Sequence, residues 1–152
     1  MKALIEQIRK ITDNYSTELR KIGEEDFSYK SEPSKWSKKE ILGHLVDSAQ
    51  NNIRRFVVSQ YEDIPKVVYQ QDSWVKIADY QHYPTTDLIE LWMLLNKHIC
   101  IILDNTSDLS AGRKSETNDP EMHTIEWLAG DYVRHLLHHI HQILSLKELP
   151  YP

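Results

Sequence analysis

The residues with the clearest capacity for chemistry are histidines, of which the chain has eight. Four of them lie close together near the C-terminus, namely His135, His138, His139 and His141. His135 and His139 are four positions apart, so in a helix their side chains share one face with Cβ atoms about 6 Å apart. Two imidazoles at this spacing can bind the same metal ion. The pair therefore predicts part of a metal site.

A third imidazole, His44, is the candidate that completes this site. It lies one turn after Ile41 in a separate predicted helix, on or beside the apolar face. The alternative is that each inward histidine is an ordinary core residue, hydrogen-bonded to a carbonyl or a tyrosine. Burying three imidazoles together costs on the order of several kcal/mol if their polar atoms are unpaired, which favours a shared metal. We predict His44, His135 and His139 as the metal ligands.

The remaining histidines carry weaker signals. His138 and His141 share the phase of the polar stripe, so we expect solvated side chains, with a supporting role behind the metal ligands as the alternative. His82, His98 and His123 have no partner at ligand spacing, and we expect them to be surface or loop residues.

No general acid or base stands out, so no catalytic residue is predicted. Asp47 follows His44 by three positions, and Asp131 precedes His135 by four. Either carboxylate could orient the neighbouring imidazole by accepting its hydrogen bond. The alternative for both is a solvated surface carboxylate. We predict no residues that bind an organic cofactor.

Four segments have the periodicity of amphipathic helices. Apolar residues recur every three or four positions over 4–22, from Ser37 to about Tyr61, from Thr85 or Thr86 to about Asn105, and from about Thr124 to Lys147. The second segment has the sharpest start. Ser37 and Glu40 form a capping box there, and Trp36 and Ile41 form a hydrophobic staple. Four helices that are each apolar on one face pack most readily as a bundle, so we predict an all-α fold.

The lengths of the connections predict the relative directions of the four helices. Residues 24–36, 62–84 and 106–123 are all longer than the connections usual between neighbouring bundle helices. Segment 62–84 is long enough to cross a whole helix length. We therefore predict a crossover that makes the second and third helices parallel and the second and fourth antiparallel. We expect its aromatic residues to cover one end of the bundle.

This wiring also brings the candidate ligands to one height. At a rise of 1.5 Å per residue, His44 lies about 10 Å from the start of its helix and His139 about 12 Å from the end of the last helix. Antiparallel packing aligns the two, whereas parallel packing would separate them by roughly two turns. Loop length and helix phase thus indicate the same site.

Composition excludes several classes of protein. The chain has 152 residues, of which 40% are hydrophobic and 27% charged, and this balance predicts a single globular domain over residues 1–152. With 4 Gly and 6 Pro there are few residues that favour turns, which disfavours an all-β fold.

A net charge of -5 without long basic clusters argues against nucleic acid as a partner. No apolar run reaches the roughly 18 residues of a membrane span, and the charged N-terminus has no secretory signal, so we expect no membrane partner and a cytoplasmic location.

Two stretches resemble motifs of a known family. They are Trp36-Ser37-Lys-Lys-Glu-Ile-Leu-Gly-His44-Leu-Val-Asp47 and His135-Leu-Leu-His138-His139-Ile-His-Gln-Ile. In this order they resemble the second-helix and last-helix motifs of the DinB-like, YfiT-related superfamily of bacterial four-helix-bundle proteins. The similarity spans nearly the whole chain, and it does not concern the DNA polymerase of similar name. It implies an up-down-down-up bundle that binds a divalent metal through His44, His135 and His139.

The resemblance also sets the expected function. It implies a metal-dependent enzyme, either a thiol-dependent S-transferase or a hydrolase, that acts on a small molecule and forms a homodimer. Zinc and nickel both suit imidazole ligands, and a low-molecular-weight thiol is the expected cosubstrate of a transferase. The alternatives are a non-catalytic metal- or ligand-binding bundle and a structural domain whose histidines belong to the core.

Overall fold

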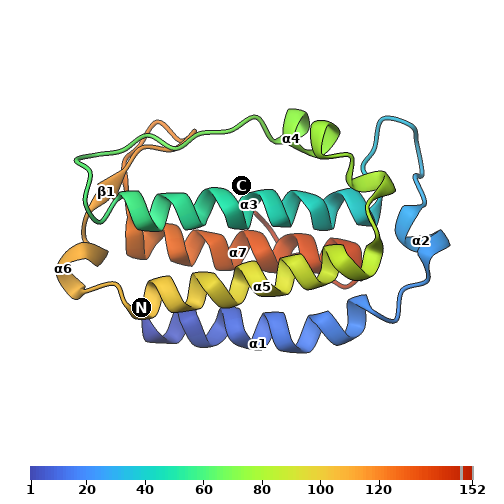
Figure 1. Ribbon diagram of the computed structural model, residues 1–152, viewed down its shortest axis with the longest axis horizontal. Coiled ribbons are helices and arrows are strands. Elements are labelled where there is room, and N and C mark those ends of the chain that lie inside the picture. Colours follow the sequence, from blue (N-terminus) through green and yellow to red (C-terminus); the bar gives the residue numbers. More distant parts are fainter. Residues whose placement is uncertain (148, 152) are drawn as a thin grey trace.

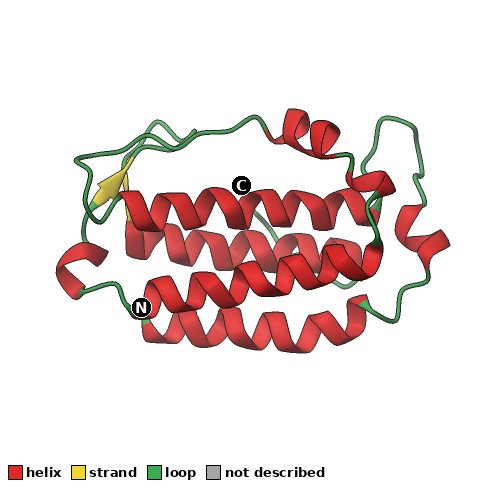
Figure 2. Cartoon of the chain, in the orientation of Figure 1, coloured by secondary structure: helices red, strands yellow, loops and turns green. Residues whose placement is uncertain are grey.

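Four long helices lie side by side in the computed structural model, which describes residues 1–147 and 149–151 (Figure 1). They are α1 (Lys2–Leu19), α3 (Lys38–Val58), α5 (Thr85–Asp104) and α7 (Ile125–Ile143). Short elements occupy the connections: α2 (Glu24–Ser28), α4 (Gln71–Ala78), the 3-10 helix η1 (Tyr80–His82), α6 (Asp108–Ala111), β1 (Lys114–Ser115) and β2 (His123–Thr124). The two strands pair antiparallel, and helices otherwise dominate the chain (Figure 2). The predicted all-α four-helix bundle is confirmed.

The four helices have the predicted up-down-down-up order. Followed from blue to red, α1 and α7 run in one direction and α3 and α5 in the other (Figure 1). Each of α1 and α3 packs against both α5 and α7. The parallel pair α3 and α5 is joined by the crossover, residues 59–84, which runs back along the whole bundle.

The core forms where the apolar stripes of the four long helices meet. Its buried side chains include Ile8, Leu19, Leu42, Leu45, Phe56, Leu88, Trp92, Ile99, Leu136 and Ile140. Their spacings of 3, 4, 7 and 11 residues within each helix place them on a single inward face. Burial of each large side chain contributes about 1.5–3 kcal/mol, so the core holds α3 and α7 in a defined relative position.

The start of α3 is set by the predicted capping box. The Ser37 hydroxyl accepts a 3.2 Å hydrogen bond from the Glu40 backbone N–H, and the Ser37 backbone N–H donates to Glu40 Oε2 at 2.8 Å. These bonds satisfy backbone donors that a helix start leaves unpaired. The height of His44 along the bundle depends on where this helix begins.

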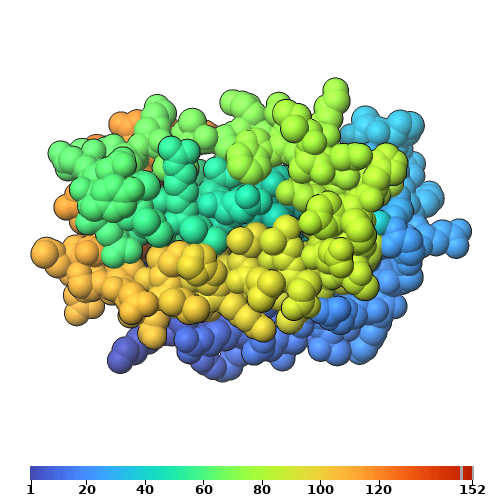
Figure 3. Space-filling view, viewed as in Figure 1, coloured from blue at the N-terminus to red at the C-terminus, as the bar shows by residue number. Residues whose placement is uncertain are grey.

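The crossover differs from its expected position. We expected its aromatic residues over one end of the bundle, but α4 and η1 pack along the side of α3. Part of α3 stays visible between the crossover and α5 (Figure 3). Tyr80 of η1 lies directly on Gly43 of α3, and its hydroxyl donates a 2.5 Å hydrogen bond to Asp47 Oδ1. The crossover is therefore attached to α3 within one turn of His44.

In the part of the chain that the structure describes, no helix is long and apolar enough to cross a membrane.

The contact between Gly43 and Tyr80 leaves no room for a side chain on α3. A Cβ atom at position 43 would stand 2.1 Å from Tyr80 Cδ2. We expect Gly43→Ala to lower the free energy of unfolding by about 1–3 kcal/mol, since overpacking outweighs the gain in helix propensity. Urea unfolding measures the change.

Gly130→Ala in α7 is the matched control. The atom nearest to a Cβ there is Arg134 Nη1 at 3.8 Å, an ordinary contact. This variant should gain up to about 1 kcal/mol of stability from helix propensity alone. Equal stability of the two variants would contradict the close approach of Tyr80.

Candidate metal centre

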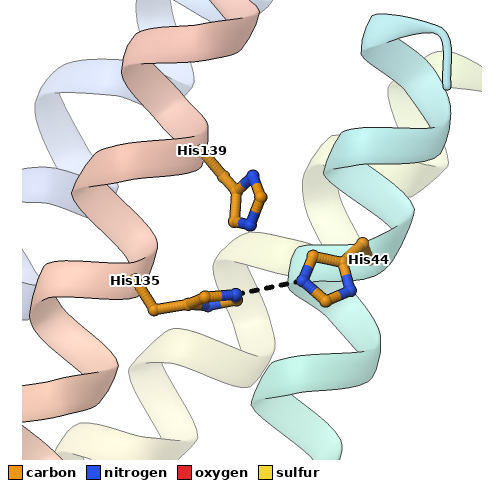
Figure 4. A group of neighbouring side chains, drawn as sticks. All are labelled: His44, His135 and His139. Atoms are coloured by element: carbon orange, nitrogen blue, oxygen red, sulfur yellow. Dashed lines mark hydrogen bonds between the residues drawn. The ribbon is translucent and has the colours of Figure 1, made fainter. Parts of the chain in front are cut away.

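Three imidazoles from two helices meet at the contact between α3 and α7. His44 extends from α3 toward His135 and His139, which lie one turn apart on α7 (Figure 4). One nitrogen atom from each ring lies within 4.8 Å of the other two. The nearest pair is His44 Nε2 and His135 Nε2, at 3.0 Å. The expectation that these three residues converge is confirmed, and their role as metal ligands stays a prediction that follows from it.

The surroundings of the site keep the rings uncharged. Burial, and after it the neighbouring His139, lowers the pKa of His44 to about 3. Burial is also the main cause that lowers the pKa of His135 and of His139. Trp36 lies against His44 with ring centroids 5.2 Å apart and adds an apolar wall. At neutral pH the three rings therefore present lone pairs and no positive charge.

The donor set fits a divalent metal ion. Ligand nitrogens at 2.0–2.1 Å from a tetrahedral ion stand about 3.3 Å apart, close to the 3.0 Å between the His44 and His135 nitrogens. The Nδ1 atom of His139 lies 3.0 Å from Gln142 Oε1. Because the amide oxygen can only accept, His139 carries its proton on Nδ1 and its Nε2 lone pair is free. Such a hydrogen bond is the usual way to orient a metal-binding imidazole.

The two candidate carboxylates have other partners. Asp47 is buried, which contradicts the solvated alternative, and its described hydrogen bond comes from Tyr80 and not from His44. Burial raises the pKa of Asp47 to about 6, although the Tyr80 bond opposes the shift. Asp131 accepts hydrogen bonds from Arg134 at 3.1 Å and from the Tyr151 hydroxyl at 2.9 Å. Neither contact orients a metal-site imidazole.

The remaining histidines divide into three groups. His138 and His141 are half-buried, not fully solvated, and their Nδ1 atoms bond the carbonyls of Leu149 and Lys147 in the C-terminal tail. His82 and His98 are exposed, as expected.

His123 departs from the expectation of a surface or loop residue. It belongs to β2, is only 9% exposed, and stacks on Trp127 with ring centroids 3.6 Å apart. The stacked ring contributes to packing between β2 and α7.

A cavity of about 560 Å³ opens beside His44 and His135. Its walls come from α3, α7, the crossover, the segment before β2 and the tail, including Ser48, Asn52, Arg55, Tyr69, Asn118 and Tyr151. These wall residues were not predicted. For those on α3 a signal existed, because polar residues recur on the inward side of the helix after His44. Tyr69 and Tyr151 lie in irregular segments, where no periodicity could indicate them.

Comparison with known proteins places the chain in a family. The model of the DinB superfamily matches residues 7–143. The "Putative metal-dependent hydrolase YfiT" of Bacillus subtilis is 28% identical over 114 residues, which are 74% of this chain and 64% of that protein. A relative with the same description from Oceanobacillus iheyensis is 28% identical over 122 residues, 80% of this chain and 69% of the relative. The chain thus spans a little under two thirds of YfiT in the sequence match.

Solved structures have the same fold. The structure of YfiT from Bacillus subtilis matches with a TM-score of 0.86 at 22% identity, over 95% of this chain and 83% of that one. A mycothiol-dependent maleylpyruvate isomerase matches with a TM-score of 0.79 at 13% identity, over 97% of this chain and 61% of that one. At identities of 22% and 13%, these structural matches show a shared fold and do not by themselves indicate a shared activity. The family model covers most of the chain, including all three histidines, and the chain therefore belongs to the DinB superfamily.

Proposed function

We propose that this protein is a metal-dependent enzyme that binds one divalent ion through His44, His135 and His139 and acts on a small molecule. The observation that carries the proposal is the convergence of three uncharged imidazoles beside a cavity of about 560 Å³. That volume is in the range of small-molecule sites. Three protein ligands leave at least one coordination position open, as in catalytic centres.

The chain's own residues have distinct parts in this site. The Nε2 atoms of His44, His135 and His139 would hold the ion, and Gln142 keeps the proton of His139 on Nδ1. Trp36 and the surrounding core restrict water around His44. A bound divalent ion lowers the pKa of a water or thiol that reaches it, and so supplies a nucleophile at neutral pH.

Two reaction types use this arrangement. Relatives described as metal-dependent hydrolases support hydrolysis, and the likeness to a mycothiol-dependent isomerase supports a thiol cosubstrate and S-transfer. Zinc and nickel are the proposed ions, because both accept imidazole ligands. The second candidate function is a metal-binding bundle without turnover, which the same three histidines would serve. A homodimer in the cytoplasm stays a prediction.

The ligand assignment predicts a change in metal stoichiometry. We expect the wild-type protein to bind one zinc or nickel ion per chain, and His44→Ala, His135→Ala and His139→Ala each to weaken binding by at least tenfold, since each removes one of three ligands. Metal analysis after equilibrium dialysis measures the bound ion.

His138→Ala is the matched control for this experiment. His138 lies on the same helix beside His139, but its Nδ1 contacts the carbonyl of Leu149. This variant should keep the full stoichiometry. Full stoichiometry in His44→Ala as well would overturn the assignment.

Turnover separates the enzyme from a binding protein. We expect zinc- or nickel-loaded protein to convert members of a panel of thiols with electrophiles, or of esters and amides. His135→Ala should lose this activity because it lacks a ligand, while the exposed control His98→Ala keeps it. Chromatographic product analysis is the measurement. No metal-dependent turnover across both panels would favour the binding bundle.

The uncharged state of the histidines predicts a pH dependence of stability. Without metal, the unfolded chain protonates these imidazoles near pH 6.5, whereas folded His44 does so only near pH 3. Below pH 6.5 the unfolded chain therefore binds more protons, and acidification favours it by about 1.4 kcal/mol per pH unit for each such group. Urea unfolding with a chelator present should show stability falling from pH 6.5 toward pH 4.

Asp47 acts in the opposite direction over part of this range. Its pKa of about 6 when folded exceeds the usual 3.8, so the folded chain binds that proton first. The proton that folded Asp47 binds offsets the effect of about one of the three histidines. The free energy of unfolding therefore still falls as the pH is lowered. His44→Gln should make the dependence of the unfolding free energy on pH shallower, by the amount that corresponds to about one proton. A stability that is flat between pH 6.5 and pH 4 would contradict the burial of uncharged rings.

A further inference from the structure

Arg55 lies on the same face of α3 as His44, at the other end of the cavity. Starting from His44, polar residues follow at intervals of four, four and three positions: Ser48, Asn52 and Arg55. These intervals keep all of them on one side of the helix. All four line the cavity together with His135. One continuous polar wall thus joins the histidines to a guanidinium group.

The guanidinium is buried and only partly used by the fold. Arg55 is 9% exposed, and its Nε and Nη2 atoms donate to the carbonyl of Val67 in the crossover, at 3.1 and 2.8 Å. The other described bond is a long one, 3.4 Å from Nη1 to Asn52 Oδ1. A guanidinium has five N–H groups, so its outer edge, between Nη1 and Nη2, retains donors for a ligand.

No opposite charge is paired with this cation within residues 1–147 and 149–151. Asp131 lines the same cavity and acts on Arg55 through space, but its oxygens accept hydrogen bonds from Arg134 and Tyr151. Asp72 also lines the cavity and is exposed. Burial lowers the pKa of Arg55, and the neighbouring Tyr69 and Asp131 oppose that shift. A buried charge without a partner is costly, and a bound anion would relieve that cost.

We infer that the substrate of this protein carries a carboxylate group, which binds the outer edge of Arg55 while the reacting end of the molecule lies at the three histidines. The second half of this statement rests on the proposed function. A carboxylate fits because its two oxygens match the two parallel N–H donors of a guanidinium edge.

The geometry also selects the shape of the substrate. Eleven positions separate His44 from Arg55, which is about 16 Å along the axis of α3. The contact of Arg55 Nη1 with Asn52, three positions nearer to His44, shows that the long Arg55 side chain reaches back toward the histidines and shortens the span. The substrate is therefore elongated, with its acid group remote from the reacting group.

Binding of simple thiols tests the inference without knowledge of the natural substrate. Mercaptoalkanoates of three to eight carbons are compared with mercaptoalkanols of the same length, by calorimetry on the zinc-loaded protein. The thiol end reports on the metal, and the acid or alcohol end reports on Arg55. We expect at least one mercaptoalkanoate to bind tenfold or more tightly than its neutral counterpart, because a hydrogen-bonded charge pair contributes about 1.5–3 kcal/mol.

Three variants test whether Arg55 causes this preference for mercaptoalkanoates. Arg55→Met should abolish the preference for acids while neutral thiols bind as before. Arg55→Lys should keep part of the preference, since the charge remains but the two parallel N–H donors of the guanidinium are lost. Arg113→Met is the matched control: Arg113 also donates to backbone carbonyls, those of Ser59 and Glu62, but does not line the cavity. It should leave the preference unchanged. If Arg55→Met does not fold, the nitrogen-15 shift of Arg55 Nε during titration of the wild-type protein with a mercaptoalkanoate replaces it as the readout.

The outcomes separate this inference from the proposed function. Equal binding of acids and alcohols at every length, with both dependent on zinc, would overturn the carboxylate site and leave the metal site intact. A preference that survives Arg55→Met would overturn it as well. If neutral thiols do not bind the zinc-loaded protein, the proposed metal site is wrong. The carboxylate site is then tested separately: a shift of the Arg55 Nε signal on adding acetate to metal-free protein would support it, and no shift would overturn it.

Discussion

The convergence of three uncharged imidazoles, one buried and two half-buried, at the contact between α3 and α7 is the constraint that orders this molecule. An imidazole nitrogen removed from water needs a partner, yet among the described residues none pairs with the buried Nδ1 atom of His44. The three rings lie edge to face with one another, and Trp36 lies against His44. They meet only because the two helices are antiparallel and in a single register. The core on either side holds that register, so packing energy maintains an arrangement that the polar groups alone would not favour.

The crossover makes this arrangement possible and also completes the site. By returning along the bundle, residues 59–84 make α3 and α5 parallel, which leaves α7 to run against α3. The same segment places Tyr80 on Gly43 and brings the Val67 carbonyl to Arg55. Topology and chemistry are therefore coupled: the connection that sets the helix order also supplies part of the cavity wall.

Charge is distributed unevenly around the cavity. Its histidine end consists of neutral donors suited to a cation, and its other end holds the Arg55 guanidinium, suited to an anion. The wall also includes the carboxylates of Asp72 and Asp131. An extended molecule with a reacting group at one end and an acid at the other would complement both ends. Much of the remaining wall is polar but uncharged, as expected of a surface that orients a ligand through hydrogen bonds.

Helix positions, helix caps and the inward phase of His44, His135 and His139 could be predicted from the amino acids, because these features depend on residues within one or two turns. Even the antiparallel relation of α3 and α7 followed from loop length, a property of the chain. The surroundings could not be predicted in this way. Asp47 looked like a surface carboxylate until Tyr80 was found above it, and His123 looked like a loop residue until it was found stacked on Trp127. Such contacts join residues far apart in the chain through segments without periodicity, so only packing in three dimensions decides them.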